Sequence, residues 1–231
     1  MAVALKTVVP WGRSLYEYAR MFDLTAADLA SRILDCAAGP SSFNAEMHRR
    51  GRAVVSCDPI YRFSAADISR RIDETREAIL NANRQSRDNF VWDEYRSPER
   101  LADARLATMQ KFLEDFPAGL AEGRYRTAEL PNLPFAGGEF DLALCSHFLF
   151  TYSALLSLDF HVAAIQEMCR VAQEVRIFPL LEQFGSERAQ HVADAVRKLV
   201  TLGYRCEIKR VPYEFQKNGN EMLRILRQQS D

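Results

Sequence analysis

Short apolar runs alternate with helix-like patterns along most of the chain. The runs are five to seven residues long and lie at 32–36, 53–57, 140–146 and 174–179. The last two are almost continuously apolar, as strands buried on both faces of a sheet require. Between them, apolar side chains recur at the spacing of one helix face, at Phe160, Ala164, Ile165 and Met168. Strands that alternate with helices in this way predict a parallel sheet with right-handed crossovers.

The stretch after the second run is too long for a plain crossover. About 65 residues separate it from the next predicted strand, at 124–127, although a crossover needs only a dozen or two. Two amphipathic helices fill the gap, one marked by Ile68, Ile72, Thr75 and Ile79 and the other by Leu106, Met109, Leu113 and Phe116. Ser97 and Pro98 provide a cap and a first turn for the second helix. We expect residues 60–122 to form a helical insertion, either a bulge packed on the sheet or a cap over a ligand site.

The C-terminal part of the chain changes pattern. A helix is predicted over 187–201, and two strands are predicted over 204–210 and 222–227, with a polar turn between them. Such a pair is typical of an antiparallel hairpin at the edge of a sheet. With 231 residues and no linker or internal repeat, residues 1–231 are expected to form a single α/β domain that carries the insertion.

Composition and charge narrow the choice of partners. Thirty Lys and Arg against thirty-one Asp and Glu leave a net charge of −1, so no overall basic field attracts nucleic acid, and a nucleic-acid partner is disfavoured. No stretch approaches the roughly twenty apolar residues that span a bilayer, and the first residues lack an apolar run of signal-peptide length. We therefore expect a cytoplasmic protein without a membrane partner.

The sequence gives no reason to expect a disulfide or a metal. The five cysteines never form a C-x-x-C pair and mostly lie inside apolar runs, at Cys36, Cys57, Cys145, Cys169 and Cys206. They are typical of reduced core thiols rather than a disulfide or zinc framework. Three histidines lie in predicted helices without a partner at metal spacing, so structural roles are expected for His48, His161 and His191.

Candidate ligand-binding residues follow the first two strands. In open parallel sheets, ligands bind outside the carboxyl ends of the strands, near the point where the strand order reverses. The first strand runs into a turn of small residues, 37–40, which lets the backbone approach a ligand closely. The second strand ends in Asp58, which is placed to accept hydrogen bonds from a ribose diol. Each feature alone is a weak signal.

A longer pattern combines these features. The block LPF at 133–135 followed by FDLALCSH at 140–147 resembles the LPF…FD pattern of class I S-adenosylmethionine-dependent methyltransferases, and the resemblance covers residues 30–230. It is strongest to a group of bacterial methyltransferase-like proteins of undefined substrate that share EYxxMF, GPxSFNxE and SHFLF, here at 17–22, 39–46 and 146–150. The resemblance implies S-adenosylmethionine as cofactor. It also implies a Rossmann-like, seven-stranded, mostly parallel sheet with a C-terminal antiparallel hairpin.

The resemblance also implies a set of cofactor-binding positions. They fall on Asp35, Ala37, Ala38, Gly39, Asp58, Ile60, Glu129, Leu130 and Ser146. Asp35 would orient the loop and the methionyl amine, Asp58 would hold the ribose hydroxyls, and Ile60 would pack on adenine. Glu129 would receive the adenine amino group, with the backbone amide of Leu130 beside it.

One position departs from the family pattern. The usual loop reads DxGxGxG, whereas this chain has Asp35-x-Ala37-x-Gly39-x-Ser41. Alanine disfavours positive φ, so Ala37 is expected to sit at a compatible dihedral angle. The replacement can lower cofactor affinity.

Residues after the fourth strand are candidates for chemistry and for binding the acceptor. His147 is the candidate general base, because an unperturbed imidazole pKa of about 6.5 suits proton uptake near neutrality. Packing of the strand end is the other interpretation of this histidine. Tyr152 is a second catalytic candidate, and Tyr16, Tyr18 and Phe148 are candidates for the acceptor pocket.

The acceptor itself stays undefined. The tetrad N/D/S-P-P-Y/F/W of many amino- and amide-nitrogen methyltransferases is absent, and aromatic and apolar residues stand in its place. A small molecule with an O, N, S or C nucleophile fits this region best, and a peptide side chain is also compatible. Neither the acceptor's identity nor the oligomeric state follows from the sequence.

Two alternative functions stay open. The acid after the second strand is shared with nicotinamide-dependent oxidoreductases, but the GxGxxG motif is missing. A catalytically weak or inactive binding or partner protein would also tolerate the alanine in the loop.

Overall fold

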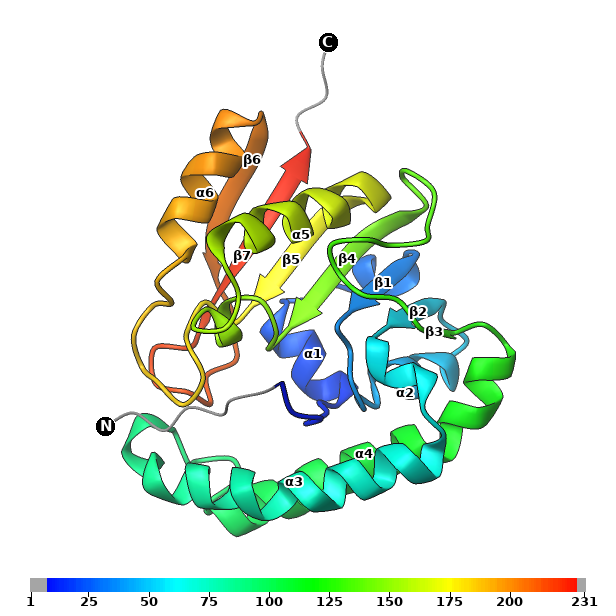
Figure 1. The fold of residues 1–231 in the computed structure, drawn as a ribbon, viewed down its shortest axis with the longest axis vertical. Helices are drawn as coiled ribbons and strands as arrows, with labels where there is room; N and C mark the ends of the chain where they lie inside the picture. The colour runs from blue at the N-terminus through cyan, green and yellow to red at the C-terminus, as the bar shows by residue number, and fades with distance from the viewer. Residues whose placement is uncertain (1–7, 228–231) are drawn as a thin grey trace.

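The described strands form one mixed sheet. The computed structural model describes residues 8–227, and within them seven strands lie in the order β3-β2-β1-β4-β5-β7-β6 (Figure 1). Their bounds are β1 Ile33–Cys36, β2 Val54–Cys57, β3 Tyr125–Arg126, β4 Phe140–Ser146, β5 Ala172–Phe178, β6 Tyr204–Arg210 and β7 Glu221–Arg227. Only β7 runs against its neighbours β5 and β6, and the other pairings are parallel. This confirms the predicted mostly parallel sheet with a C-terminal antiparallel hairpin.

The centre of the sheet lies between β1 and β4. All four residues of β1 are buried, because β2 and β4 pair with its two edges and helices cover its faces. From β1 the chain first builds β2 and β3 on one side and then crosses to β4 and β5 on the other. The strand order therefore reverses at β1 and β4, and their carboxyl ends border a crevice of the kind where ligands bind.

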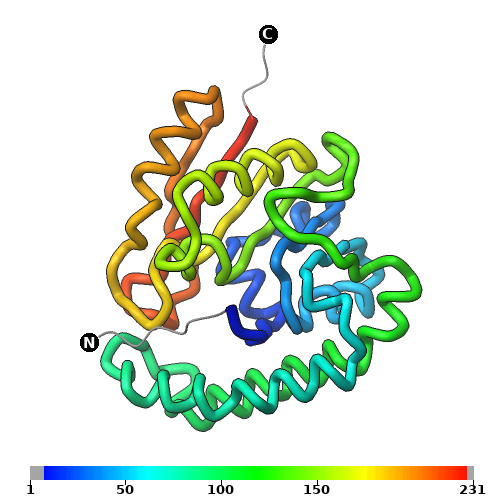
Figure 2. Tube along the Cα trace, in the orientation of Figure 1, coloured from blue at the N-terminus to red at the C-terminus, as the bar shows by residue number. Residues whose placement is uncertain are grey.

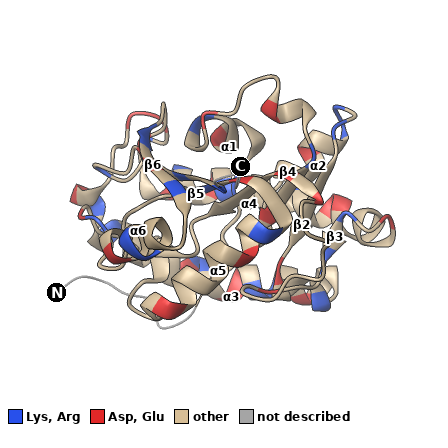
Figure 3. Ribbon diagram, turned by 90° about the horizontal axis from the view of Figure 1, so that it is seen from above, with Lys and Arg blue, Asp and Glu red and all other residues tan. Residues whose placement is uncertain are grey.

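Helices cover both faces of the sheet (Figure 3). On one face lie α1, Leu15–Met21, and α2, Phe43–His48, and their apolar side chains share a core with β1, β2 and β4. On the other face lie α5, Leu158–Val171, and α6, Val192–Thr201. Helix α1 is missing from the sequence-based prediction, because seven residues are too few to show a helical period. Its local signal is the capping box between Ser14 and Glu17.

The predicted insertion forms two long antiparallel helices. They are α3, Ala65–Gln85, and α4, Pro98–Ala121, which begin after the N-caps Ser64 and Ser97. The pair lies across the carboxyl ends of β4 and β5, at the foot of the sheet in Figures 1 and 2. Four buried rings join α4 to the sheet edge: Tyr61, Phe112, Phe116 and Tyr125, with centroids 5.1–5.9 Å apart. The expected helices are confirmed, and their position brings them to the strand ends where ligands bind.

Most of the cysteines lie in the core of the fold. Four of the five cysteines are buried, Cys206 is half-buried, and all five are free thiols. Acidic and basic side chains are interspersed over the elements drawn in Figure 3. Within residues 8–227, no helix is both long enough and apolar enough to cross a membrane.

Candidate cofactor and acceptor site

The loop after β1 contains two residues with positive φ. Gly39 has a φ of +54°, and Ala37 has a φ of +52°. The expectation that Ala37 takes a dihedral angle compatible with alanine is therefore wrong. The loop is fixed from below, because the Ala38 amide donates to the Cys57 carbonyl at 3.3 Å and the Gly39 amide donates to Asp58 Oδ2 at 2.9 Å. The hydrogen bonds of a tight strand-end turn thus hold Ala37 in a conformation that costs an L-residue roughly 1–2 kcal/mol.

Replacing Ala37 by glycine is expected to stabilise the fold by about 0.5–1 kcal/mol. Glycine adopts positive φ freely, and the larger entropy of the unfolded glycine chain offsets only part of the gain. Ala38→Gly is the matched control at a neighbouring residue without positive φ, where the same change should destabilise by a similar amount. Urea unfolding of the wild type and the two variants measures both changes in stability. A less stable Ala37→Gly variant would show that the backbone of Ala37 is not strained.

Asp58 links the two strand-end loops. Its Oδ2 accepts from Gly39, and its Oδ1 accepts from the Ile60 amide at 2.8 Å, which caps the short helix Pro59–Arg62. Burial and the charge of Glu129 raise the pKa of Asp58 to about 6, although the two amide hydrogen bonds oppose this. A carboxylate has about four acceptor sites. Two of them are left to receive a diol from the cavity side.

Asp35 lies under the loop instead of in a cavity wall. It is completely buried, and it accepts hydrogen bonds from the Tyr18 hydroxyl at 3.0 Å and from Ser56 Oγ at 3.4 Å. Burial raises the pKa of Asp35 to about 8, more than these hydrogen bonds lower it. Asp35 is therefore a buried residue underneath the β1 loop. Tyr18, which hydrogen-bonds Asp35, is the residue of this pair that lines the cavity.

The buried Asp35 makes stability pH-dependent. Because the pKa of Asp35 is about 8 in the folded protein and 3.8 for an ordinary aspartate, as in the unfolded chain, the folded state keeps a proton that the unfolded state releases between these pH values. Stability should therefore fall as pH rises through this window, by about 1.5 kcal/mol from pH 6.5 to pH 8. Urea unfolding at the two pH values tests this against Asp35→Asn, which cannot titrate. Equal pH slopes for the two proteins would show that Asp35 is ionised throughout.

A cavity of about 920 Å³ opens above these loops. Many predicted cofactor residues line it, namely Ala37, Ala38, Gly39, Asp58, Ile60, Glu129, Leu130 and Ser146. Phe148 and Tyr18 are also in its wall. A Cβ added to Gly39 would meet nothing within 4 Å, so the loop backbone faces open space. Pockets of roughly 300–1,000 Å³ accommodate cofactor-sized ligands.

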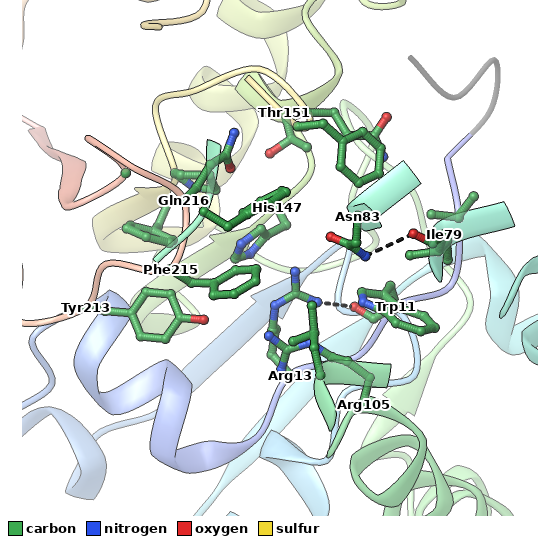
Figure 4. A pocket seen from close by; sticks show the side chains of 18 of the residues that line it. Trp11, Arg13, Ile79, Asn83, Arg105, His147, Thr151, Tyr213, Phe215 and Gln216 are labelled. Atoms are coloured by element: carbon green, nitrogen blue, oxygen red, sulfur yellow. Dashed lines mark hydrogen bonds between the residues drawn. The ribbon is translucent and has the colours of Figure 1, made fainter. Parts of the chain in front are cut away.

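The N-terminal segment crosses above the β1 loop and separates this cavity from a smaller one. A Cβ on Gly12 would come within 2.1 Å of the Pro40 carbonyl oxygen, so only glycine permits this close crossing. The crossing places Trp11 and Arg13 in the walls of both cavities. The smaller cavity, about 100 Å³, is shown in Figure 4. It lies between the strand ends, the α3–α4 pair and the loop before β7.

His147 is the side chain of β4's carboxyl end that lines both cavities. Its φ is +51°, its amide donates to the Phe178 carbonyl at 2.7 Å, and its Nδ1 lies 2.9 Å from Ser146 Oγ. Burial, together with the positive charges of Arg13 and Arg105, holds the pKa of His147 well below its usual range. The imidazole is therefore neutral at pH 7. Strained backbone of this kind persists where the surroundings enforce it, which is common at functional sites.

Two predicted acceptor-pocket residues lie elsewhere than expected. Tyr16 is 59% exposed, hydrogen-bonds Arg20 and lines neither cavity. Tyr18 contacts Asp35 at the cofactor side. Tyr152 does line the smaller cavity, with its hydroxyl accepting from the Val9 amide at 3.2 Å.

Sequence reasoning missed the two charged residues of the smaller cavity, Arg13 and Arg105. Arg105 is spaced among the apolar residues of α4 and is 1% exposed, whereas an arginine in an amphipathic helix is usually solvated. Its only sequence signal is its place on the buried face, between Leu101 and Met109 at helical spacing.

A relative that matches almost the whole chain shows the family to which the protein belongs. The chain belongs to the same family as uncharacterized protein MJ0045 of Methanocaldococcus jannaschii. The two are 34% identical over 224 residues, which cover 96% of this chain and 98% of that protein. This relative is archaeal, whereas the sequence resemblance pointed to a bacterial group. No family model matches the chain.

Solved structures with a similar fold include two methyltransferases. Magnesium protoporphyrin IX methyltransferase from Synechocystis PCC 6803, with bound SAM, is 15% identical over 87% of this chain and 73% of that chain, with a TM-score of 0.45. A putative S-adenosyl-L-methionine-dependent methyltransferase from Methanococcus maripaludis is 12% identical over 94% of this chain and 84% of that chain, with a TM-score of 0.42.

Proposed function

We propose that the protein is an S-adenosylmethionine-dependent methyltransferase that acts on a small molecule. The observation that carries the proposal is the pair of adjoining cavities with His147 in the wall of both. The larger one offers the Asp58 carboxylate, loop backbone and the exposed acid Glu129, which suit a ribose diol, a methionine chain and an adenine amino group. The smaller one offers space for an acceptor on the other side of His147.

The residues present fit this cofactor. Asp58 keeps two acceptor sites, the Gly39 backbone faces open space, and Glu129 lies close enough to Asp58 to raise its pKa. When bound, S-adenosylmethionine would supply a methyl group activated by its positively charged sulfonium sulfur. The chain's contribution is to align the two ligands and exclude water, because positioning lowers the barrier of such a displacement most.

His147 would take the proton of the acceptor's nucleophile. In this role, the imidazole carries its own proton on Nδ1, donates it to Ser146 Oγ, and keeps the Nε2 lone pair for the acceptor. A low pKa keeps that lone pair available at neutral pH, although it also makes the base weaker. Because the charges of Arg13 and Arg105 lower the pKa of His147, a negative charge on the acceptor would raise this pKa and make His147 a stronger base.

The insertion would act as a cap over both ligands. Arg71, Glu74 and Thr75 of α3 line the larger cavity, and Leu101 and Arg105 of α4 line the smaller one. If the insertion were only a bulge packed on the sheet, none of its residues would line the two cavities. We therefore assign the α3–α4 pair a role in closing the site.

Ligand binding by the intact protein tests the proposal. S-adenosylhomocysteine or S-adenosylmethionine at one hundred times its dissociation constant should stabilise the protein by about 2.7 kcal/mol, seen as a higher melting temperature. NAD should give no shift, and a shift with NAD alone would favour a nicotinamide-dependent oxidoreductase. Binding without methyl transfer to any small molecule in a labelled-donor screen would favour an inactive partner protein, and absence of binding would end the proposal.

A further inference from the structure

The smaller cavity carries an uncompensated positive charge. Among its described lining residues are two arginines, Arg13 and Arg105, and no carboxylate (Figure 4). The nearest acid is Glu17, behind the wall, whose carboxylate lies 2.5 Å from Arg105 Nη1 and 4.0 Å from Arg13 Nε. Two guanidinium groups against one carboxylate leave one positive charge in a buried place, where an unpaired charge is costly.

Glu17 has no capacity left to compensate the second arginine. Besides Arg105, its oxygens accept hydrogen bonds from the Ser14 amide at 3.0 Å and from the hydroxyls of Tyr95 at 3.0 Å and Tyr213 at 3.1 Å. Burial raises the pKa of Glu17, but Arg105 and Arg13 outweigh it and lower the pKa to about 2. Glu17 is thus ionised, and both of its carboxylate oxygens accept hydrogen bonds. It binds only the Nη1 group of Arg105.

The other end of Arg105 has no partner in the described part of the chain. Arg105 is 1% exposed, yet its Nε and Nη2 lack hydrogen-bond partners. Arg13 Nε and Thr151 Oγ1, on other walls of the same cavity, are also buried and without partners among the described residues. Three guanidinium nitrogens and one hydroxyl of residues that line this small cavity therefore lack a hydrogen-bond partner among the described residues, whereas buried polar groups are normally satisfied.

Aromatic rings make up much of the remaining wall, beside the side-chain amides of Asn83, Gln183 and Gln216. The rings are those of Phe90 in the insertion, Phe178 at the end of β5, Phe184 in the loop after β5, and Phe215 in the loop before β7. A flat, apolar ligand can stack against these rings, and an anionic group on that ligand would pair with the two guanidinium groups.

We propose that the methyl acceptor is a small, flat, apolar carboxylate, held by Arg13 and Arg105 with its nucleophile turned toward His147. This deepens the proposed function and rests on it. One carboxylate balances the single uncompensated charge and accepts from two guanidinium groups in a planar arrangement. A phosphate dianion would leave an excess negative charge beside Glu17. The carboxylate is the anchor, and a hydroxyl or amine elsewhere on the molecule receives the methyl group.

The test compares an acid with its neutral amide. Binding of 4-hydroxybenzoate, 4-hydroxybenzamide and inorganic phosphate is measured by calorimetry on the full chain saturated with S-adenosylhomocysteine, or without it if that ligand does not bind. The acid should bind at least about tenfold tighter than the amide, since a charge-assisted pair contributes on this scale. Equal affinities, no binding of the acid at millimolar concentration, or tighter binding of phosphate would each overturn the proposal.

Variants assign the preference to the two arginines. Arg13→Gln leaves the Glu17–Arg105 pair in place, and Arg105→Lys keeps a positive charge opposite Glu17 but removes the planar set of donors. Both should bring the acid-to-amide affinity ratio close to one. Arg100→Met, an exposed position on the same helix outside both cavities, should leave it unchanged. Circular dichroism checks each fold, and the wild-type ratio decides the proposal if a variant does not fold.

Parallel titration with S-adenosylhomocysteine separates this inference from the proposed function. Cofactor-product binding without a preference for the acid overturns the anionic acceptor and leaves the methyltransferase assignment standing. A preference for the acid without cofactor-product binding retains the anion site and overturns the assignment on which its role as an acceptor site rests.

Discussion

Replacing Asp58 by alanine is expected to weaken S-adenosylhomocysteine binding by at least about 100-fold. Two hydrogen bonds from a diol to an ionised acceptor contribute about 1.5–3 kcal/mol each, so losing both gives 10²-fold or more. The variant also frees the Gly39 amide, which Asp58 Oδ2 holds at 2.9 Å, and the loop loses part of its support. Both effects act on the cofactor side of the site.

The fold should survive this change. Asp58 is ionised at pH 7.5, since its pKa is about 6, and burial makes this charge costly, so its removal offsets part of the loss of the two amide hydrogen bonds. Asp73→Ala is the control, because Asp73 is exposed on α3 and lines neither of the two cavities. Calorimetry gives the affinity and circular dichroism the fold. Wild-type affinity in Asp58→Ala would remove the second strand end from the cofactor site.

His147→Gln is expected to reduce the methyl-transfer rate by about 10²-fold or more. A positioned base contributes roughly 10²–10⁴-fold when the nucleophile carries a proton. Affinity for S-adenosylhomocysteine should stay within a few-fold, since glutamine keeps a polar group of similar length next to Ser146. Single-turnover rates with an acceptor from the acid series would measure the loss. An unchanged rate would show that His147 packs the strand end and that positioning alone supplies the catalysis.

The pH dependence of the wild-type rate adds a second signature. The active imidazole is neutral, so kcat/KM should fall on acidification through the pKa of His147 in the free enzyme. Burial and the charges of Arg13 and Arg105 place that pKa well below the usual value, so the fall should begin well below about pH 6.5. Under saturating acidic acceptor, the carboxylate offsets the arginine charges, and the fall in kcat should move to higher pH. The His147→Gln variant should show neither fall.

The chain itself determined most of the fold. Apolar runs of strand length fixed β1, β2, β4 and β5 to within one or two residues, and the pattern after 204 gave the β6–β7 hairpin. Such runs are readable because burial on both faces leaves no polar positions. The strand ends also pointed to the loop that contains Gly39 and to Asp58, because ligands bind at the carboxyl edge of a parallel sheet, whereas Glu129 was indicated by the family resemblance.

Only the tertiary structure decided the acceptor side of the site. Glu17 and Arg105 lie 88 residues apart in sequence, and they meet because the α3–α4 pair folds back across the strand ends. The conformation of Ala37 and the low pKa of His147 likewise depend on neighbours from other segments. Local sequence encodes propensity and the period of burial, but charge balance, desolvation and enforced backbone angles arise only where distant segments exclude water together.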